Sequence, residues 1–175
     1  MDKKEIHRKK SLFLKAFEDY SDAIFRFGLS RLSDRDKATD LTQDTFLRVW
    51  NYLQKNDAPE NLRAFIYKVA SNLIIDEYRK TRPSESLETM SEEKGFEPSA
   101  EELSLPGDRV DGQKAIEMIK QVPEPYGSTL FMRFVEELTL TEISSITGQS
   151  ENAVSVQVHR GIGKLRKIWN HEDKK

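Results

Sequence analysis

The residues of this chain best suited to binding chemistry form a polar stripe between positions 152 and 160. Asn152, Ser155, Val156, His159 and Arg160 recur at steps of three and four, so a helix would place them on one face. Amide, hydroxyl, imidazole and guanidinium groups can hydrogen-bond to base edges in the major groove of DNA. The stripe therefore predicts a helix that recognises duplex DNA.

Two short helical patterns around a Gly-containing turn would hold this stripe in position. Thr139 and Glu142 have the T-x-x-E spacing of a capping box, Gly148 can adopt a left-handed turn, and Ser150 is the expected N-cap of the second helix. The aliphatic residues expected to pack inward are Ile143, Ile146, Val154, Val158, Ile162 and Leu165. This pattern is typical of a helix-turn-helix, although an ordinary helical hairpin in an all-helical domain has it too.

Helical periodicity elsewhere in the chain predicts an all-α protein of two small domains, at 1–82 and 111–175. The helices expected before the helix-turn-helix cover approximately residues 11–32, 34–54, 61–81, 111–122 and 126–137. The residues expected to face inward in the second helix are Ala38, Leu41, Thr45, Val49 and Leu53. Those expected in the third are Leu62, Phe65, Ile66, Val69, Ala70 and Leu73.

Acidic residues are concentrated between the two predicted domains. Residues 82–108 contain eight acids and two bases, so removal of this segment would change the net charge from −2 to +4. The segment contains several Pro, Gly and Ser residues and has no sustained hydrophobic period. We therefore expect a flexible acidic linker at 83–110. A solvated spacer explains its charge at least as well as an active role, and the basic flanks suit phosphate contacts.

The helix at 34–54 carries a second stripe, roughly opposite its aliphatic face. The stripe has the spacing i, i+3, i+4 and i+7 and consists of Asp40, Gln43, Asp44 and Leu47. Phe46 and Trp50 lie beside it. A short acidic patch with apolar neighbours suits a basic helical partner. The alternative is a solvated helix face with Phe46 and Trp50 in the core.

The helix at 61–81 has a polar and basic side that suits single-stranded nucleic acid. This side is formed by Lys68, Asn72, Arg79 and, just beyond the helix, Arg82. Tyr67 and Tyr78 stand nearby, so aromatic stacking and positive charge would be combined. The loop at 56–60 precedes this helix and could help to form a pocket for an extruded base. An ordinary basic surface is the alternative explanation.

Composition argues against catalytic chemistry. The 175 residues include no Cys and three scattered His, so thiolate metal sites and a cysteine nucleophile are excluded. No Gly-rich phosphate loop follows a strand, and we expect no metal, cofactor or small-molecule substrate. No apolar run approaches the ~18 residues that span a bilayer, and the N-terminus lacks a signal-peptide core. We expect a cytoplasmic protein that is not an enzyme.

Together these segments resemble the extracytoplasmic-function (ECF) sigma factors, the smallest members of the sigma-70 family. The family's core-polymerase-binding helix is matched by DLTQDTFLRVW at 40–50, and its promoter −10 element by AFIYKVASNLIIDEYRKTR at 64–82. The C-terminal helix pair is similar to its −35 reader. The resemblance covers nearly the whole chain. It implies a region 2 at 1–82, a region 4 at 111–175, and a function in promoter-specific transcription initiation with core RNA polymerase.

The resemblance also implies roles for individual residues. Contacts with the clamp helices of the polymerase β′ subunit would come from Asp40, Gln43, Asp44 and Leu47. An unstacked base of the −10 element and its backbone would be held by Asn56, Asp57, Lys68, Asn72, Arg79 and Arg82. The −35 major groove would be faced by Asn152, Ser155, Val156, Gln157, His159 and Arg160. Further implied partners are promoter DNA, the β flap and an anti-sigma factor, which in this family is often membrane-bound.

Several positions depart from the family pattern. Lys or Arg is usual where Ser155 stands, Ser where Val156 stands and Arg where Gln157 stands, so the −35 preference should differ from a G-rich one. Phe65 replaces a usual Trp. Gly161, in place of a usual Ala, and Gly163 should each soften the helix by about 1 kcal/mol. The alternative function is a stand-alone helix-turn-helix transcriptional regulator with an N-terminal helical interaction domain, in which the Asp40–Trp50 patch would lack a purpose.

Overall fold

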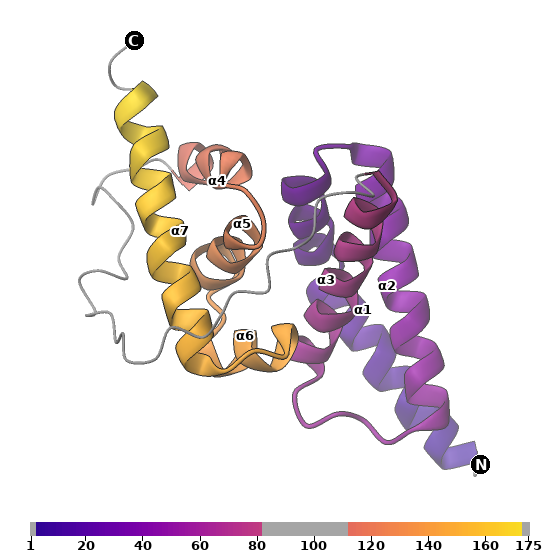
Figure 1. Cartoon of the computed structure of the whole chain (residues 1–175). Helices are drawn as coiled ribbons and strands as arrows, with labels where there is room; N and C mark the ends of the chain where they lie inside the picture. Colours follow the sequence, from indigo (N-terminus) through magenta and orange to yellow (C-terminus); the bar gives the residue numbers. More distant parts are fainter. Residues whose placement is uncertain (1–2, 82–111, 173–175) are drawn as a thin grey trace. The chain divides into compact units, whose positions relative to one another are not determined.

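The computed structural model of the chain describes residues 3–81 and 112–172, and the regular elements in these two ranges are all helices. The all-α prediction is therefore confirmed. The chain divides into two compact units, Met1–Glu85 and Ser86–Lys175, and each is described by itself (Figure 1). Arg82 and the predicted linker lie outside the described residues. No helix in the described ranges combines the length and the apolar character that crossing a membrane requires.

Within residues 3–81, the N-terminal unit consists of three helices, α1 (Lys3–Leu32), α2 (Arg35–Lys55) and α3 (Leu62–Thr81), each in contact with the other two (Figure 1). The ends of α2 and α3 lie within one residue of the predicted ones. α1 begins eight residues earlier than predicted, because the basic start of the chain continues the helix. Asp34 caps α2, and its carboxylate accepts hydrogen bonds from two backbone N–H groups at 2.9 and 3.0 Å.

The core of this unit forms where α1 and α2 approach each other closely. All five residues predicted to face inward on α2 are buried, and none is more than 5% exposed. Gly28 of α1 faces this stripe, and a Cβ atom at Gly28 would lie 2.5 Å from Cδ2 of Leu41. A larger residue at position 28 would therefore require Leu41 to move, although Leu41 is itself buried. The short distance between the two helices depends on this glycine.

The inward face of α3 differs from the predicted one. The residues that the structure buries on α3 are Ala64, Ile66, Tyr67, Ala70 and Ile74. The predicted core residues that remain partly exposed are Leu62, Phe65, Val69 and Leu73. The reason is the use of Tyr67 as a core side chain: its ring is fully buried and lies 5.6 Å from the ring of Phe27. The prediction had assigned Tyr67 to the polar side.

The C-terminal unit consists of shorter helices followed by one long one (Figure 1). In order they are α4 (Gly112–Gln121), α5 (Tyr126–Leu130), the π-helical turn η1 (Phe131–Val135), α6 (Leu140–Thr147) and α7 (Glu151–Glu172). The sequence predicted one uninterrupted helix at 126–137. The structure replaces its second half by η1, in which the backbone N–H of Glu136 donates to the carbonyl of Phe131 at 3.1 Å.

The local features predicted for the helix-turn-helix are confirmed. Thr139 and Glu142 form a reciprocal capping box at the start of α6. Gly148 ends α6 with φ 73°, in the left-handed region, and Ser150 accepts a hydrogen bond from the N–H of Ala153 at 3.2 Å. The six predicted inward residues are all buried, at 3% exposure or less. α6 and α7 therefore pack as a helix-turn-helix pair requires.

Two glycines of this pair should respond oppositely to substitution by Ala. G148A should lower the free energy of unfolding by about 1–2 kcal/mol, because Ala tolerates a left-handed backbone poorly. G163A should raise it by about 1 kcal/mol, because a Cβ atom there meets nothing within 4 Å and Ala favours the helix. Urea unfolding followed by the fluorescence of Trp169 in a W50F background would measure both. The same sign of change for both variants would contradict the structure.

Candidate nucleic-acid interface

The acidic stripe of α2 is exposed to solvent. Asp40, Gln43, Asp44 and Leu47 are all exposed, and Leu47 is 58% exposed. Phe46 is buried and Trp50 partly so, because their rings pack against α1, at 4.9 Å from Phe17 and 5.1 Å from Phe13 respectively. The two aromatic residues thus belong to the core, whereas the stripe beside them is free to meet a partner.

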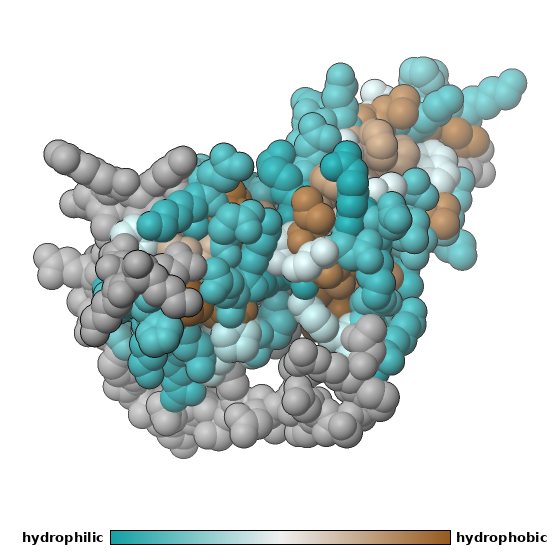
Figure 2. Space-filling model, turned by 90° about the horizontal axis from the view of Figure 1, so that it is seen from above, coloured by the Kyte–Doolittle hydropathy of each residue, from teal (hydrophilic) through white to brown (hydrophobic). Residues whose placement is uncertain are grey.

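Large hydrophobic side chains of α1 and α2, the helices that contribute the rings of Phe13, Phe17, Phe46 and Trp50, are also exposed. Leu14 and Phe17 of α1 are 54% and 46% exposed, and Leu47 belongs to the stripe of α2. Figure 2 shows hydrophobic residues reaching the surface among hydrophilic ones over the N-terminal unit. Exposed apolar side chains beside carboxylates are typical of a surface that binds another protein.

The polar side of α3 also faces solvent. Lys68, Asn72 and Arg79 are exposed and lie on one face of the helix by their spacing. Arg82 lies outside the described residues. The two tyrosines expected to stack on bases are used otherwise: Tyr67 is buried, and the Tyr78 hydroxyl donates a hydrogen bond to the backbone carbonyl of Arg31. The prediction is therefore wrong for Tyr67, whose ring packs against Phe27 of α1; Tyr78 is partly exposed, and its hydroxyl bond ties α3 to α1.

A different aromatic pair lies beside the loop between α2 and α3. The rings of Tyr52, in the last turn of α2, and Phe65, in the first turn of α3, are 4.5 Å apart and partly exposed. Phe65 is a predicted core residue, and the periodicity of the sequence assigns no role to Tyr52. Their signal in the sequence is weak: each is an aromatic residue within four positions of an end of the loop.

The loop itself is held at both ends. Asn56 and Asp57 are exposed, and the Asn56 side chain donates to the carbonyl of Tyr52 at 3.0 Å. At the other end, the side-chain oxygen of Asn61 accepts a hydrogen bond from the N–H of Ala64 at 2.9 Å and so caps α3. The loop residues between these two caps are therefore held in place at both ends by hydrogen bonds.

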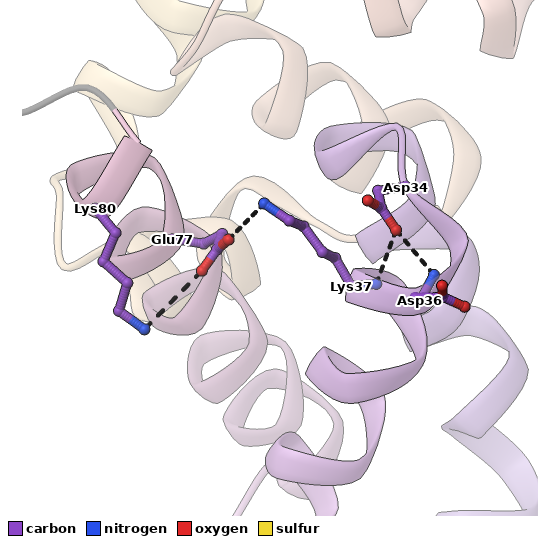
Figure 3. A network of polar contacts seen from close by, with 5 residues as sticks. All are labelled: Asp34, Asp36, Lys37, Glu77 and Lys80. Carbon is purple, nitrogen blue, oxygen red and sulfur yellow. Dashed lines mark hydrogen bonds and ion pairs between the residues drawn. The ribbon is translucent and has the colours of Figure 1, made fainter.

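A network of charges joins the start of α2 to the last turns of α3 (Figure 3). The Lys37 ammonium lies 2.7 Å from the Glu77 carboxylate, and Lys80 lies 3.9 Å from it. The hydrogen bond from Lys37, assisted by its charge, lowers the pKa of Glu77 below its ordinary value. The same contact raises the pKa of Lys37. Both effects favour the charged pair, and its Glu77 lies on the same end of α3 as Arg79.

On α7 the structure exposes part of the predicted recognition stripe. Asn152 is exposed, and Ser155, His159 and Arg160 are partly exposed. These four side chains supply hydrogen-bond donors and acceptors along about two helical turns. They remain the candidates for contacts with base edges.

Two further residues predicted to face the groove are buried. Gln157 is 1% exposed and its side-chain oxygen accepts a hydrogen bond from the Thr129 hydroxyl at 2.9 Å, so it faces α5 and its assignment to the groove is wrong. Val156 lies on the outward side by its helical phase but is 7% exposed. Because so little of its side chain is exposed, Val156 can make almost no contact with a base, and it does not belong to the candidate interface.

Close packing accompanies the Gln157 hydrogen bond. A Cβ atom at Gly161, one turn further along α7, would lie 3.0–3.2 Å from three side-chain atoms of Leu130. Gly161 therefore allows α5 to pack closely on α7, in addition to its predicted effect on helix stability. Among the described residues, no group of three His, Asp or Glu residues could hold a metal ion.

Both halves of the chain match models of known protein families. The model described as "Sigma-70 region 2" matches residues 16–83, and the model described as "Sigma-70, region 4" matches residues 112–165. The ECF RNA polymerase sigma factor SigW of Bacillus subtilis (strain 168) is 28% identical over 95% of this chain and 96% of its own length. The ECF RNA polymerase sigma factor SigM of the same organism is 24% identical over 88% and 93%.

A solved structure has a similar fold. It is the sigma factor RpoE in complex with the anti-sigma factor NepR from Bartonella quintana. The TM-score is 0.66 with 18% sequence identity, and the match covers 90% of this chain and 96% of that one. At this level of identity the similarity concerns the fold.

The Glu77 pair makes stability depend on pH in a defined direction. Because the folded-state pKa of Glu77 is lowered, its stabilising effect is present above the ordinary value of 4.5 and is lost as the pH falls through the folded-state value. E77Q should therefore be less stable than the wild type at neutral pH and equally stable in acid. Urea unfolding with Trp50 as the probe, in a W169F background, would measure this. A difference that persists unchanged in acid would contradict the role of the ion pair.

Proposed function

The chain belongs to the sigma-70 family as an ECF sigma factor that directs transcription initiation by RNA polymerase, and we propose which of its residues make each contact. Sigma factors are specificity subunits without enzymatic activity. The alternative of a stand-alone helix-turn-helix regulator is set aside, because the family match includes residues 16–83 as well as the C-terminal unit.

One observation carries the proposal: α2 and α3 each bury one face in the same core and leave a chemically distinct face exposed. The exposed face of α2 holds Asp40 and Asp44, and that of α3 holds Lys68 and Arg79. An acidic face suits a basic protein helix, and a basic face suits phosphates. The N-terminal unit can therefore bind the polymerase and a DNA strand at the same time without competition for one surface.

The proposed contact with the β′ clamp helices is the stripe of Asp40, Gln43, Asp44 and Leu47. Its carboxylates supply charge complementarity, and Leu47 supplies apolar area that is removed from water on binding. Support comes from its exposure beside the packed rings of Phe46 and Trp50. Because the stripe lies on a packed helix, little conformational entropy is lost when the partner binds.

The proposed −10 site consists of the loop with Asn56 and Asp57, together with Asn72, Lys68 and Arg79. The amide and carboxylate groups can hydrogen-bond to the Watson–Crick edge of an extruded base, and the two cations follow the backbone. Stacking would come from Tyr52 and Phe65 in place of the tyrosines first expected. The free energy of these contacts offsets the cost of unstacking the base, which is a few kcal/mol.

The proposed −35 contacts are made by Asn152, Ser155, His159 and Arg160 of α7. The N-terminal part of α7, which carries these residues, is weakly basic. Arg160 is therefore the main candidate for a bidentate contact with guanine, which contributes about 1–3 kcal/mol of discrimination. The C-terminal unit is also the proposed partner of the β flap. Both roles agree with a helix-turn-helix whose second helix is held by α5 and α6.

We also propose an anti-sigma factor as a partner and the cytoplasm as the location. The solved structure of similar fold contains an anti-sigma factor, and this chain exposes Leu14, Phe17 and Leu47, which a regulatory protein could cover. The cytoplasm follows from the location of polymerase and promoters. Whether such a regulator is membrane-bound would be decided by co-purification from membrane and soluble fractions.

Substitution of the α2 stripe should weaken polymerase binding. The variant D40A/Q43A/D44A should bind sigma-free polymerase at least about 10-fold more weakly, because it loses the charged and amide contacts together. A competition assay with labelled wild-type protein at fixed salt would measure the affinity. The control D19A/D22A removes two exposed carboxylates from α1 and should change it less than about twofold. Equal affinities for the triple variant and the wild type would refute this assignment.

Base capture and backbone contact on α3 can be separated by their salt dependence. K68A/R79A should reduce the slope of log affinity against log salt for a −10 single strand by about 1.4, since each phosphate contact contributes about 0.7. N72A should weaken binding about 10-fold with an unchanged slope, because it removes an uncharged contact. Titrations of holoenzyme with a labelled oligonucleotide at several salt concentrations would test both. A changed slope in N72A would speak against its role in base recognition.

A further inference from the structure

Lys9 is buried, which is unusual for a lysine. It lies in the part of α1 that precedes the predicted helix start, and its side chain is 8% exposed. Its ammonium lies 3.3 Å from the Glu5 carboxylate and donates a hydrogen bond to the backbone carbonyl of Asn56 at 3.0 Å. Burial of an ammonium group is unfavourable unless it is paired and hydrogen-bonded, so these two contacts account for its position.

The residue that Lys9 holds is the first of the loop between α2 and α3. Asn56 has an extended backbone, with φ −130° and ψ 166°, and its backbone N–H and side-chain amide both donate to the Tyr52 carbonyl. These two bonds tie Asn56 to its own helix. The bond from Lys9 spans 47 positions in sequence and ties the carbonyl side of Asn56 to α1. The direction in which the chain leaves α2 is therefore fixed from two helices.

We propose that Lys9 is a positioning residue that orients the 56–60 loop for capture of the −10 base through its hydrogen bond to the Asn56 carbonyl. The inference rests on the proposed role of this loop and adds a residue that does not touch DNA. Its physical basis is preorganisation: a small displacement of a binding group costs much of its contact energy, and a loop fixed to a packed helix is displaced less.

The charge of Lys9 points to the same role. A solvated lysine in the basic first ten residues would favour phosphate without regard to base identity. The Lys9 ammonium is instead turned inward to Glu5 and the loop, so its charge is unavailable for contact with a DNA backbone. The effect of its removal should therefore depend on which base is captured.

The test compares K9M with K10M in the holoenzyme formed from the full chain. Met keeps most of the apolar stem of Lys9 and removes the donor, and Lys10 is the adjacent, exposed lysine, so both variants lose one charge. The probe is a labelled oligonucleotide with the non-template −10 sequence of a promoter mapped by transcript starts, and the same oligonucleotide with each −10 base changed in turn. Polymerase affinity and binding to the −35 duplex are measured in parallel.

K9M should bind the unchanged oligonucleotide about 10-fold more weakly, the size expected for loss of one hydrogen bond to a charged group. It should also discriminate less between the unchanged base and its substitutes at one −10 position. K10M should match the wild type within about twofold. K9R should recover most of the affinity that K9M loses. The affinities of K9M for polymerase and for the −35 duplex should stay unchanged. The ratio of the affinities for the unchanged and the substituted oligonucleotides is decisive even if K9M folds less completely. A smaller folded fraction would weaken binding to every oligonucleotide equally and leave this ratio unchanged.

Failure of this inference can be distinguished from failure of the proposed −10 site. If D57A and N72A lose base discrimination but K9M keeps it, the site stands and the positioning role of Lys9 is wrong. If none of the three variants changes discrimination, the −10 site itself is misplaced. Equal weakening of K9M and K10M would reduce Lys9 to a general contributor of positive charge.

Discussion

Burial of the Tyr67 ring against Phe27 sets the rotation of α3 about its axis, and that rotation decides which side chains of α3 remain exposed. With Tyr67 inward, the side chains left outside are Lys68, Asn72 and Arg79. The same rotation moves Phe65 from the core toward the loop, where its ring meets Tyr52. In a unit of three helices each side chain serves either the core or a partner, so one large ring that packs inward decides the role of its neighbours.

The C-terminal unit obeys the same constraint with different chemistry. The side-chain amide of Gln157 could hydrogen-bond to a base. Its oxygen instead accepts a hydrogen bond from the Thr129 hydroxyl, so Gln157 packs against α5. A buried amide would be costly without a partner, and the hydroxyl supplies one. Gly161 lets Leu130 come close to the same face of α7. These contacts hold α7 at one rotation, and Ser155, His159 and Arg160 remain partly exposed as a consequence.

The features of the fold that depend on residues close in sequence could be predicted. The contacts between residues far apart in sequence could not. The capping box at Thr139, the left-handed Gly148 and the inward stripe of α2 depend on residues close in sequence, and each was predicted correctly. Tyr67 was not, because tyrosine suits both a core and a polar surface, and the choice depends on α1. The contact of Lys9 with Asn56 joins residues 47 positions apart and leaves no periodic signal. The residue assignments to polymerase and DNA stay proposals.

The inward turn of Gln157 has a consequence for how promoters are selected. Each bidentate contact between a side chain and a base contributes about 1–3 kcal/mol of discrimination, and positions 155 and 157, where the family usually has basic residues, hold a short Ser and an inward Gln. Few strong contacts remain for the −35 duplex. At the proposed −10 site, by contrast, a base would be captured only after unstacking, so a mismatch would forfeit the contacts that offset that cost. Under the proposed assignments, discrimination between promoters therefore rests more on the loop at 56–60 than on α7.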